Sequence, residues 1–399
     1  MLAAVAPLPA TESESLSTFD ALGRVLAADV HSVLDVPPTD NTSMDGYALR
    51  CADVPAAGTV LPVSQRIPAG VVGTPLAPGS AARIFTGAQV PAGADAVVIQ
   101  EQCAVQDGSA VRIDAVPEPG QWIRRRGEDV RAGSVALEAG TRLTPQAFGL
   151  AASVGAAHLR VMRRARVALF STGDELAMPD ETPPDRLRPG AIYNSNRYTL
   201  RGLLQQFGCE VSDFGIVPDR LDATREALRL AATGHDLILT SGGVSVGEED
   251  HLRPTAAAEG RIDLWQMAIK PGKPFAFGAI RNGTPRETLL LGLPGNPVSS
   301  FVAFLLIVRP VLLRLQGVAD TAPRVLTLRA AFDWTRPDRR REFLRARLND
   351  AGELELYPNQ SSGVLTSAVW ADGLVDNPPS QTIARGDAVR FLPFSELMS

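Results

Sequence analysis

The chain has 399 residues, of which 45% are hydrophobic and 21% are charged, with a formal net charge of −5. This length predicts about two to four domains, because single hydrophobic cores rarely grow beyond ~250–300 residues. The acidic balance argues against nonspecific binding to nucleic acid, which requires a basic surface. The three cysteines form no CxxC pair and no HExxH motif is present, so we expect neither a zinc site nor a disulfide framework.

The first ten residues are apolar but lack a basic start and contain Pro7 and Pro9. This pattern is not typical of a signal peptide. The longest apolar run, residues 301–308, is too short to span a membrane. We therefore predict no membrane partner and, given the sparse cysteines, a location in a reducing cytoplasm.

The first part of the chain predicts two kinds of structure, namely helices and a small β domain. Apolar residues at helical intervals predict a helix over residues 18–28, and a second helix is expected over residues 145–154 with Thr144 as N-cap. Between them lie short apolar pieces cut by Pro and Gly, which are typical of a small β domain. We assign residues 1–38 and 124–160 to an elongated connector or dimerisation domain, and residues 39–123 to a β domain inserted within it.

From residue 161 onward the pattern alternates between strands and helices. Strands are expected at residues 167–170, 213–217, 236–239 and 289–291, and helices at residues 197–207 and 222–232 and from residues 254 and 298. This alternation predicts a mostly parallel sheet covered on both faces, with ligands bound beyond the carboxyl ends of the strands. We assign residues 161–318 to this α/β domain and residues 319–399 to a small C-terminal β-barrel-like domain. The predicted fold class is therefore multidomain α/β plus β.

Three turns of the α/β domain suit an anionic ligand. The turn over residues 240–250 combines small residues, which let backbone N–H groups approach a phosphate, with acids that can hold the accompanying cation. A second turn carries Lys270 and Lys273 between Pro and Gly, and the third, residues 293–297, opens a helix. One such turn alone is most often an ordinary loop. Three in one stretch, each at the end of a strand, predict an anion site.

Acidic residues follow three successive strands of the same domain. They are Asp174 and Glu175, then Asp219, then Glu248, Glu249 and Asp250. Converging carboxylates suit Mg²⁺, although Asp174 or Asp219 alone could equally be a helix N-cap. Ser245 has no neighbouring His–Asp pair, so we expect metal activation and charge neutralisation rather than a covalent intermediate.

Eight stretches together resemble the MoeA family of molybdopterin molybdenumtransferases, which includes the E domain of gephyrin. They occur in family order and are residues 43–48, 83–88, 124–129, 171–176, 193–196, 240–250, 270–274 and 293–297. The resemblance implies insertion of molybdenum from molybdate into adenylylated molybdopterin, with release of AMP and Mg²⁺ as the cofactor. It also implies a homodimer, and other cofactor-biosynthesis enzymes and molybdoenzyme chaperones as further partners.

Carried over motif by motif, the resemblance also implies roles for individual residues. The implied catalytic residues are Asp45, Thr86, Asp129, Glu175, Asp219 and Asp250, with Glu175 and Asp250 as metal ligands. The implied substrate-binding residues are Thr172, Gly173, Asp174, Ser241, Gly242, Gly243, Ser245, Lys270, Lys273, Pro294, Gly295, Asn296, Arg345 and Thr366. Among these, Lys270, Lys273 and Arg345 would face the oxyanion, and Thr366 stands where some relatives carry Ser.

Two other functions share part of this pattern. A related molybdopterin adenylyltransferase would carry similar Gly-rich and Pro-Gly-Asn-Pro turns on the same kind of α/β domain. The flanking β domains and the motifs of Asp45 and Asp129 argue against it. A non-catalytic cofactor-binding scaffold would be expected to lose the acids, which are present here.

Overall fold

The computed structural model describes residues 1–107, 109–244 and 251–398, which form two compact units. The first unit comprises Ser15–Leu22 and Leu26–Val161. The second comprises Met1–Glu14, Gly23–Val25 and the chain from Met162 onward. Each unit has its own hydrophobic clusters.

The first unit contains a six-stranded sheet in the order β7-β4-β6-β5-β9-β8. Successive residues of its strands enter opposite faces, since Tyr47 and Leu49 pack into one cluster and Ala48 into the other. The strands are β4 (Gly46–Leu49), β5 (Thr59–Ile67), β6 (Ala81–Ile84), β7 (Ala96–Ile99), β8 (Cys103–Gln106) and β9 (Ala110–Ile113).

The remainder of this unit is built from short paired strands and one helix. Its helix α1 (Pro145–Ser153) was expected, and the Thr144 hydroxyl accepts a hydrogen bond from the Ala147 amide at 3.4 Å. The flanking strands are β1 (Ser13–Ser17), β2 (Val30–His31), β3 (Asn41–Thr42), β10 (Ile123–Arg124), β11 (Val135–Leu137) and β12 (His158–Met162). Strand β2 pairs with β11, and β3 pairs with β10.

The helix predicted over residues 18–28 is wrong. Only a 3-10 turn, η3 (Thr18–Asp20), forms there, and Gly23 then takes a positive φ of 76°. Beyond Gly23, the Leu26 amide donates to the Thr141 carbonyl and the Ala27 amide donates to the Arg160 carbonyl. The backbone therefore satisfies its hydrogen bonds with distant segments instead of with its own preceding turn.

The assignment of residues 1–38 to the connector also needs correction at its start. Met1–Glu14 belongs to the second unit, where Val5 is buried in the large hydrophobic cluster. The Leu8 amide donates to the Leu315 carbonyl at 2.8 Å, and the Arg314 guanidinium donates to the Val5 carbonyl at 2.8 Å. The sequence did not reveal this attachment, because Pro7 and Pro9 break up the apolar pattern of the first ten residues.

The second unit is organised around a six-stranded sheet in the order β16-β13-β17-β21-β20-β18. Strand β13 runs parallel to β16 and β17, and β17 runs parallel to β21, whereas β20 and β18 are antiparallel. The antiparallel edge was not expected from the sequence. The strands are β13 (Arg166–Thr172), β16 (Glu210–Val217), β17 (Leu237–Ser241), β18 (Gly260–Gln266), β20 (Pro274–Ile280) and β21 (Thr288–Leu293).

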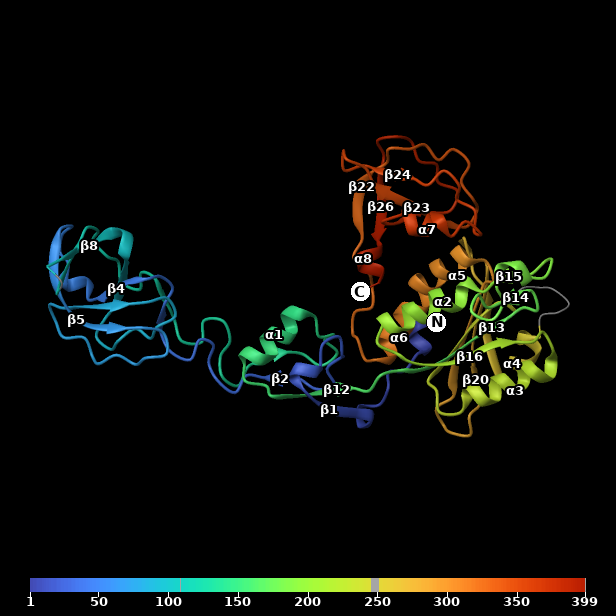
Figure 1. The fold of residues 1–399 in the computed structure, drawn as a ribbon, viewed down its shortest axis with the longest axis horizontal. Coiled ribbons are helices and arrows are strands. Elements are labelled where there is room, and N and C mark those ends of the chain that lie inside the picture. Colours follow the sequence, from blue (N-terminus) through green and yellow to red (C-terminus); the bar gives the residue numbers. More distant parts are fainter. Residues whose placement is uncertain (108, 245–250, 399) are drawn as a thin grey trace. The chain divides into compact units, whose positions relative to one another are not determined.

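Helices cover both faces of this sheet (Figure 1). One face packs against α2 (Ser195–Gln206) and a long helix over Pro297–Leu315, and the other against α3 (Leu221–Ala232) and α4 (Leu252–Glu259). Short elements at its edge are β14 (Leu176–Ala177) and β15 (Ile192–Tyr193), which pair in parallel. The remaining 3-10 turns among the described residues are η1 (Leu2–Ala4), η2 (Ala10–Glu12), η4 (Cys51–Asp53), η5 (Gln100–Gln102) and η6 (Pro184–Arg186).

The long helix consists of α5 (Pro297–Ala303), a π-helical turn η7 (Phe304–Val308) and α6 (Arg309–Leu315). By length and composition alone it could cross a membrane, with a mean hydropathy of 2.0. However, 89% of that stretch is buried inside the protein. The helix is therefore the core helix of the α/β domain.

The C-terminal part is a β domain whose sheet has the order β19-β23-β25-β26-β22, with β24 also paired to β23. An isolated bridge between Ala330 and Leu354 links the two sides of this sheet, as in a small barrel. Its elements are β19 (Ile269–Lys270), β22 (Leu326–Arg329), β23 (Arg341–Leu348), β24 (Leu354–Leu356), α7 (Thr366–Trp370), β25 (Gly373–Asn377), β26 (Ala388–Pro393) and α8 (Phe394–Leu397).

Strand β19 is supplied to this C-terminal sheet by the α/β domain. It pairs in parallel with β23, so that Ile269 lies opposite Arg341 and Lys270 lies opposite Glu342. This pairing joins the two domains of the unit at the place where the candidate site is formed.

The core helix offers a test of where stability resides. Phe304 is fully buried and its ring lies 6.0 Å from that of Phe207. We expect Phe304→Ala to lower the free energy of unfolding by about 3–5 kcal/mol, because it leaves a cavity in a close-packed core. Urea denaturation followed by circular dichroism measures this. Phe19→Ala is the control, since Phe19 is 84% exposed, and an equal loss in both variants would contradict the assignment.

Candidate active site

A pocket of about 510 Å³, here called the Gly-rich pocket, lies where parallel strands of the α/β sheet end. Ser171 of β13 is in register with Ser241 of β17, which is in register with Leu293 of β21. The turns that follow these strands therefore meet at one edge. The pocket is lined by Thr172, Gly173, Glu175, Leu176, Ile192, Asn196, Asp219, Ser241, Gly242, Gly243, Val244, Pro274, Pro294, Gly295, Asn296, Pro297 and Ser299.

Two glycines of this pocket are required by the backbone. Gly242 and Gly243 have φ angles of 86° and 64°. A Cβ atom on Gly242 would lie 2.4 Å from the Thr172 carbonyl oxygen, and one on Gly243 would lie 2.7 Å from the Thr172 hydroxyl. Both positions therefore exclude side chains, for reasons of conformation and of space.

The Thr172 hydroxyl is the polar group of this pocket best suited to meet a ligand. Thr172 is 6% exposed, and its Oγ1 atom finds no hydrogen-bond partner among the residues that the structure describes. The neighbouring Ser171 and Ser241 hydroxyls bond to each other at 3.0 Å. A buried hydroxyl without a partner loses free energy unless something bonds to it, so Thr172 favours a polar ligand.

Acids gather at the mouth of the Gly-rich pocket. Asp174 and Asp219 each accept a hydrogen bond from the other's backbone amide, both at 3.2 Å. Glu175 and Asp219 line the pocket, whereas Asp174 does not. The predicted Ser245 and Asp250, together with Glu248 and Glu249, lie outside the described residues. In the described part of the chain, no three His, Cys, Asp or Glu side chains form a metal-binding group.

A second pocket, the Lys270/Arg345 pocket, has a volume of about 320 Å³ and lies beside the β19–β23 pairing. Arg345 is only 1% exposed, and its guanidinium donates to the Ser367 hydroxyl at 3.1 Å and to two backbone carbonyls at 3.3 Å. Burial lowers the pKa of Arg345 to about 10, so it remains cationic at neutral pH. The lining residues are Lys270, Pro271, Trp334, Glu342, Leu344, Arg345, Gln360 and Ser361.

Arg345 lacks the usual counter-charge of a buried cation. No carboxylate within residues 1–107, 109–244 and 251–398 forms an ion pair with it. Buried charges are normally paired, because an unpaired charge in a low-dielectric interior is strongly unfavourable. A cation held only by neutral groups at a pocket wall therefore favours an anionic ligand.

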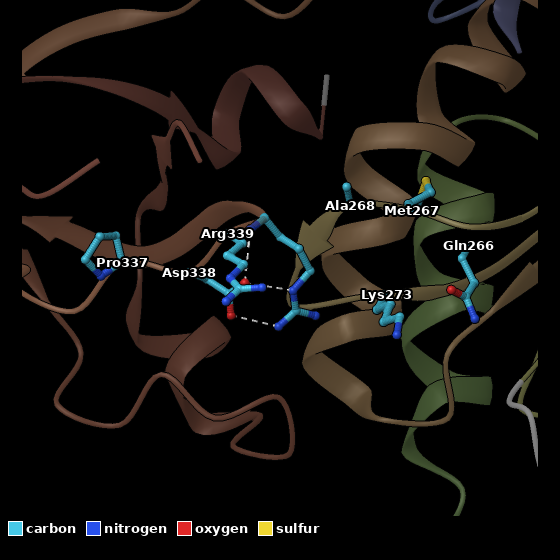
Figure 2. A pocket seen from close by; sticks show the side chains of 8 residues that line it. Gln266, Met267, Ala268, Lys273, Pro337, Asp338 and Arg339 are labelled. Atoms are coloured by element: carbon cyan, nitrogen blue, oxygen red, sulfur yellow. Dashed lines mark hydrogen bonds and ion pairs between the residues drawn. The ribbon is translucent and has the colours of Figure 1, made fainter. Parts of the chain in front are cut away.

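The two lysines that were expected to face one oxyanion line different pockets. Lys270 lines the Lys270/Arg345 pocket and already forms ion pairs with Glu342 at 3.2 Å and with Asp338 at 3.4 Å. Lys273 instead lines a third, open pocket, the Lys273/Arg339 pocket. Figure 2 shows Lys273 and Gln266 on one side of it, with Asp338 and Arg339 on the other. The hydrogen bond from Arg340 holds the pKa of Asp338 well below its usual range.

Thr366, an expected substrate-binding residue, and its neighbour Ser367 lie in different surroundings. Thr366 is exposed, does not line the Lys270/Arg345 pocket, and its hydroxyl lies 3.2 Å from the Tyr357 hydroxyl. The hydroxyl that contacts Arg345 belongs to Ser367, which is fully buried. Because α7 begins at Thr366, the next side chain points in another direction and reaches the guanidinium.

Three of the predicted catalytic residues belong to the first unit. The Asp45 carboxylate accepts hydrogen bonds from the Thr86 amide and the Thr86 hydroxyl, both at 2.7 Å. These bonds, the amide first, hold the pKa of Asp45 below its usual value. Asp129 is exposed, and its amide donates to the Val36 carbonyl at 3.0 Å.

Several pocket residues were missed from the sequence. Glu342 lies between charged and apolar residues of one strand, and no local pattern distinguishes it from a surface acid. Trp334 and Gln360 are far from the glycine-rich turns in sequence. The missed residues include Trp334, Glu342, Gln360 and Ser361, which line the Lys270/Arg345 pocket, and Ser367, which contacts Arg345.

Three family models match the chain in order. Residues 1–155 match the MoeA N-terminal region (domain I and II). Residues 168–314 match a probable molybdopterin binding domain, and residues 327–394 match the MoeA C-terminal region (domain IV).

Individual relatives cover nearly the whole chain. It is 36% identical over 401 residues to the molybdopterin molybdenumtransferase of Haemophilus influenzae, covering 98% of this chain and 96% of that protein. It is 39% identical over 373 residues to molybdopterin molybdenumtransferase 2 of Mycobacterium tuberculosis, covering 90% and 89%. The solved structure of the molybdopterin biosynthesis moeA protein from Pyrococcus horikoshii OT3 is similar with a TM-score of 0.82 and 28% identity, covering 98% and 97%.

The Gly-rich turn can be tested by adding one methyl group. We expect Gly242→Ala to destabilise the α/β domain by about 1–3 kcal/mol, because it combines a strained backbone with a clash against the Thr172 carbonyl. Thermal unfolding measures this. Gly295→Ala is the matched control, since nothing lies within 4 Å of the added Cβ. Equal stability of the two variants would contradict the close approach described here.

The Asp45–Thr86 contact predicts a defined pH dependence. A lowered pKa means that the contact stabilises the fold above about pH 4 and that this stabilisation is lost as the pH falls through the lowered value. Thr86→Val removes the hydroxyl bond but keeps the amide bond, so we expect the Asp45 pKa to rise. Carboxyl ¹³C NMR titration measures it. Ser43→Ala, which removes a hydroxyl bonded to the Trp122 carbonyl, should leave the Asp45 pKa unchanged.

Proposed function

The chain belongs to the molybdopterin molybdenumtransferase family, and from that membership we propose that it transfers molybdenum from molybdate to adenylylated molybdopterin, releasing AMP. Its role in molybdenum cofactor biosynthesis and its enzymatic nature follow from the family itself. The adenylylated substrate, the oxyanion site and the metal are the parts that we infer.

One observation carries the proposal: a single short segment lines both pockets that the reaction needs. Lys270 and Pro271 line the Lys270/Arg345 pocket, and Pro274, four residues after Lys270, lines the Gly-rich pocket. A second link is the hydrogen bond from the Val298 amide to the Ser362 carbonyl at 3.0 Å, which ties the start of the core helix to the loop beside Ser361. An oxyanion and an adenylate bound in these pockets would be neighbours.

The Gly-rich pocket suits the adenylylated substrate. Breaking its phosphoanhydride bond leaves additional negative charge on the departing phosphate, which fixed polar groups stabilise. The Thr172 hydroxyl is free to donate there, and the narrow glycine turn lets a phosphate approach the backbone. The apolar Leu176 and Ile192 on the same wall suit a planar ring.

The acids at the mouth of the Gly-rich pocket fit a magnesium ion. Mg²⁺ usually takes one or two carboxylates and completes its shell with water and substrate phosphates, so a dedicated cage of three acids is not required. Glu175 and Asp219 line the pocket and would hold the ion, and Asp250 was expected beside them. When bound, the ion would supply charge neutralisation at the phosphate.

The Lys270/Arg345 pocket suits molybdate, a tetrahedral oxyanion. Arg345 is the main argument, because it is a buried cation without a carboxylate partner in the described chain. Its planar guanidinium can donate two parallel hydrogen bonds to an oxyanion. The proposal places the enzyme in the cytoplasm as a homodimer, with other cofactor-biosynthesis enzymes and molybdoenzyme chaperones as partners.

Arg345→Gln tests the oxyanion assignment separately from the nucleotide assignment. We expect molybdate affinity, measured by isothermal titration calorimetry on the full chain, to fall at least tenfold, because a buried charge-assisted contact is typically worth about 1.5–3 kcal/mol. AMP binding should change less than twofold, since Arg345 does not line the Gly-rich pocket. Arg347→Gln is the matched control on the same strand, where Arg347 is exposed. Equal loss of both ligands would contradict the assignment.

A further inference from the structure

Glu342 is a buried carboxylate in the wall of the proposed oxyanion pocket. It is fully buried and lies opposite Lys270 in the β19–β23 pairing. Its Oε2 atom accepts hydrogen bonds from the Trp334 indole at 2.8 Å, the Asp338 amide at 3.1 Å and the Asn377 amide group at 3.4 Å. That oxygen is therefore saturated and anchors the surrounding loop.

The other oxygen of Glu342 is in a different situation. Oε1 is buried and accepts no hydrogen bond from the described residues, and it forms an ion pair with the Lys270 ammonium at 3.2 Å. An ionised carboxylate can accept hydrogen bonds but cannot donate them. The pocket thus contains an acceptor with spare capacity close to the place where an anion would bind.

This carboxylate lowers the affinity of the pocket for anions. Among the lining residues, Lys270 and Arg345 are cationic and Glu342 is anionic, which leaves one net positive charge. Asp338 and Arg340, ion-paired to each other at 2.9 Å beside the pocket, offset one another. A glutamine at position 342 could keep the bonds to Oε2 and would leave two positive charges. The carboxylate must therefore contribute something other than affinity.

We propose that Glu342 is a specificity-determining residue that makes the pocket prefer an oxyanion carrying a proton over a fully ionised one. The inference rests on the proposed function, because it assumes that an oxyanion binds beside Lys270 and Arg345. A ligand O–H donates to Oε1 while the remaining ligand oxygens accept from the two cations. A fully ionised oxyanion instead places one of its oxygens against Oε1 of Glu342. Both atoms are acceptors, so the contact is repulsive in a buried site.

The acid–base chemistry of molybdate and sulfate explains how Glu342 can separate them. Sulfate and molybdate are both tetrahedral dianions in water, so shape and charge separate them poorly. Hydrogen molybdate is a much weaker acid than hydrogen sulfate. Molybdate therefore acquires a proton far more readily in a site where a ligand O–H can donate to a carboxylate. The carboxylate oxygen Oε1, which accepts no hydrogen bond from the described residues, therefore discriminates against sulfate because sulfate brings no proton.

Glu342→Gln tests this on the purified full chain. We measure molybdate binding by calorimetry and its displacement by sulfate, in the wild type and the variant. We expect the ratio of sulfate affinity to molybdate affinity to rise at least tenfold, because the new amide can donate to a bare oxyanion. Glu355→Gln is the matched control, since Glu355 lies in the same domain and pairs with Arg347. A ratio within twofold of wild type, with molybdate still bound, would overturn the proposal.

A second measurement needs only the wild-type protein, so it holds even if the variant does not fold. Inorganic phosphate carries at least one proton near neutral pH and sulfate carries none. We expect phosphate to displace molybdate at least tenfold better than sulfate, and equal or better displacement by sulfate would overturn the proposal. Failure of the proposed function is distinguishable: in that case molybdate would bind wild type and Arg345→Gln equally, or not at all.

Discussion

The pairing of Lys270 with Glu342 across β19 and β23 is the contact on which the candidate site depends. These strands come from different domains of one unit, and their register sets an ammonium beside a fully buried carboxylate. Without Lys270, Glu342 would be a buried charge with no ion-pair partner in the described part of the chain, which is strongly destabilising. Without Glu342, Lys270 would keep only its longer contact to Asp338 at 3.4 Å. The same pairing also sets the wall against which Arg345 is buried.

The turn that follows Lys270 connects this pairing to the Gly-rich pocket. Gly272 has a φ of 113°, which lets the chain reverse sharply, and the Met267 amide closes the turn by donating to the Lys273 carbonyl at 3.0 Å. After this reversal, Lys273 lines the open Lys273/Arg339 pocket and Pro274 lines the Gly-rich pocket. Two proline rings restrict the backbone between these points. The distance between the Gly-rich pocket and the Lys270/Arg345 pocket is therefore fixed by a few covalently connected residues. This suits the proposed reaction between a ligand in one pocket and a ligand in the other.

Sequence reasoning predicted which turns lie together where placement follows from local pattern, and it missed placements that depend on strand register. Thr172, Ser241, Gly242 and Pro294 line one pocket because parallel strands end at a common edge, and this was predictable from the alternation of strands and helices. The opposite placement of Lys270 and Glu342 depends on how two distant strands align, which no periodicity reveals. The same limit explains why the contact between Ser367 and Arg345 was missed, and why residues 18–28 form no helix. In each case contacts between distant segments decided the outcome.

The coexistence of Arg345 and Glu342 in one small pocket is the strongest sign that the pocket selects among anions. A site evolved only for tight binding would leave its cations unopposed, because every added positive charge strengthens the attraction for any dianion. Such a site would also bind sulfate, which matches molybdate in shape and charge. A buried carboxylate weakens the attraction for every anion. Only a ligand that carries a proton offsets this loss, because it can donate a hydrogen bond to the carboxylate. The arrangement therefore exchanges affinity for discrimination, as repulsive groups in specific binding sites do.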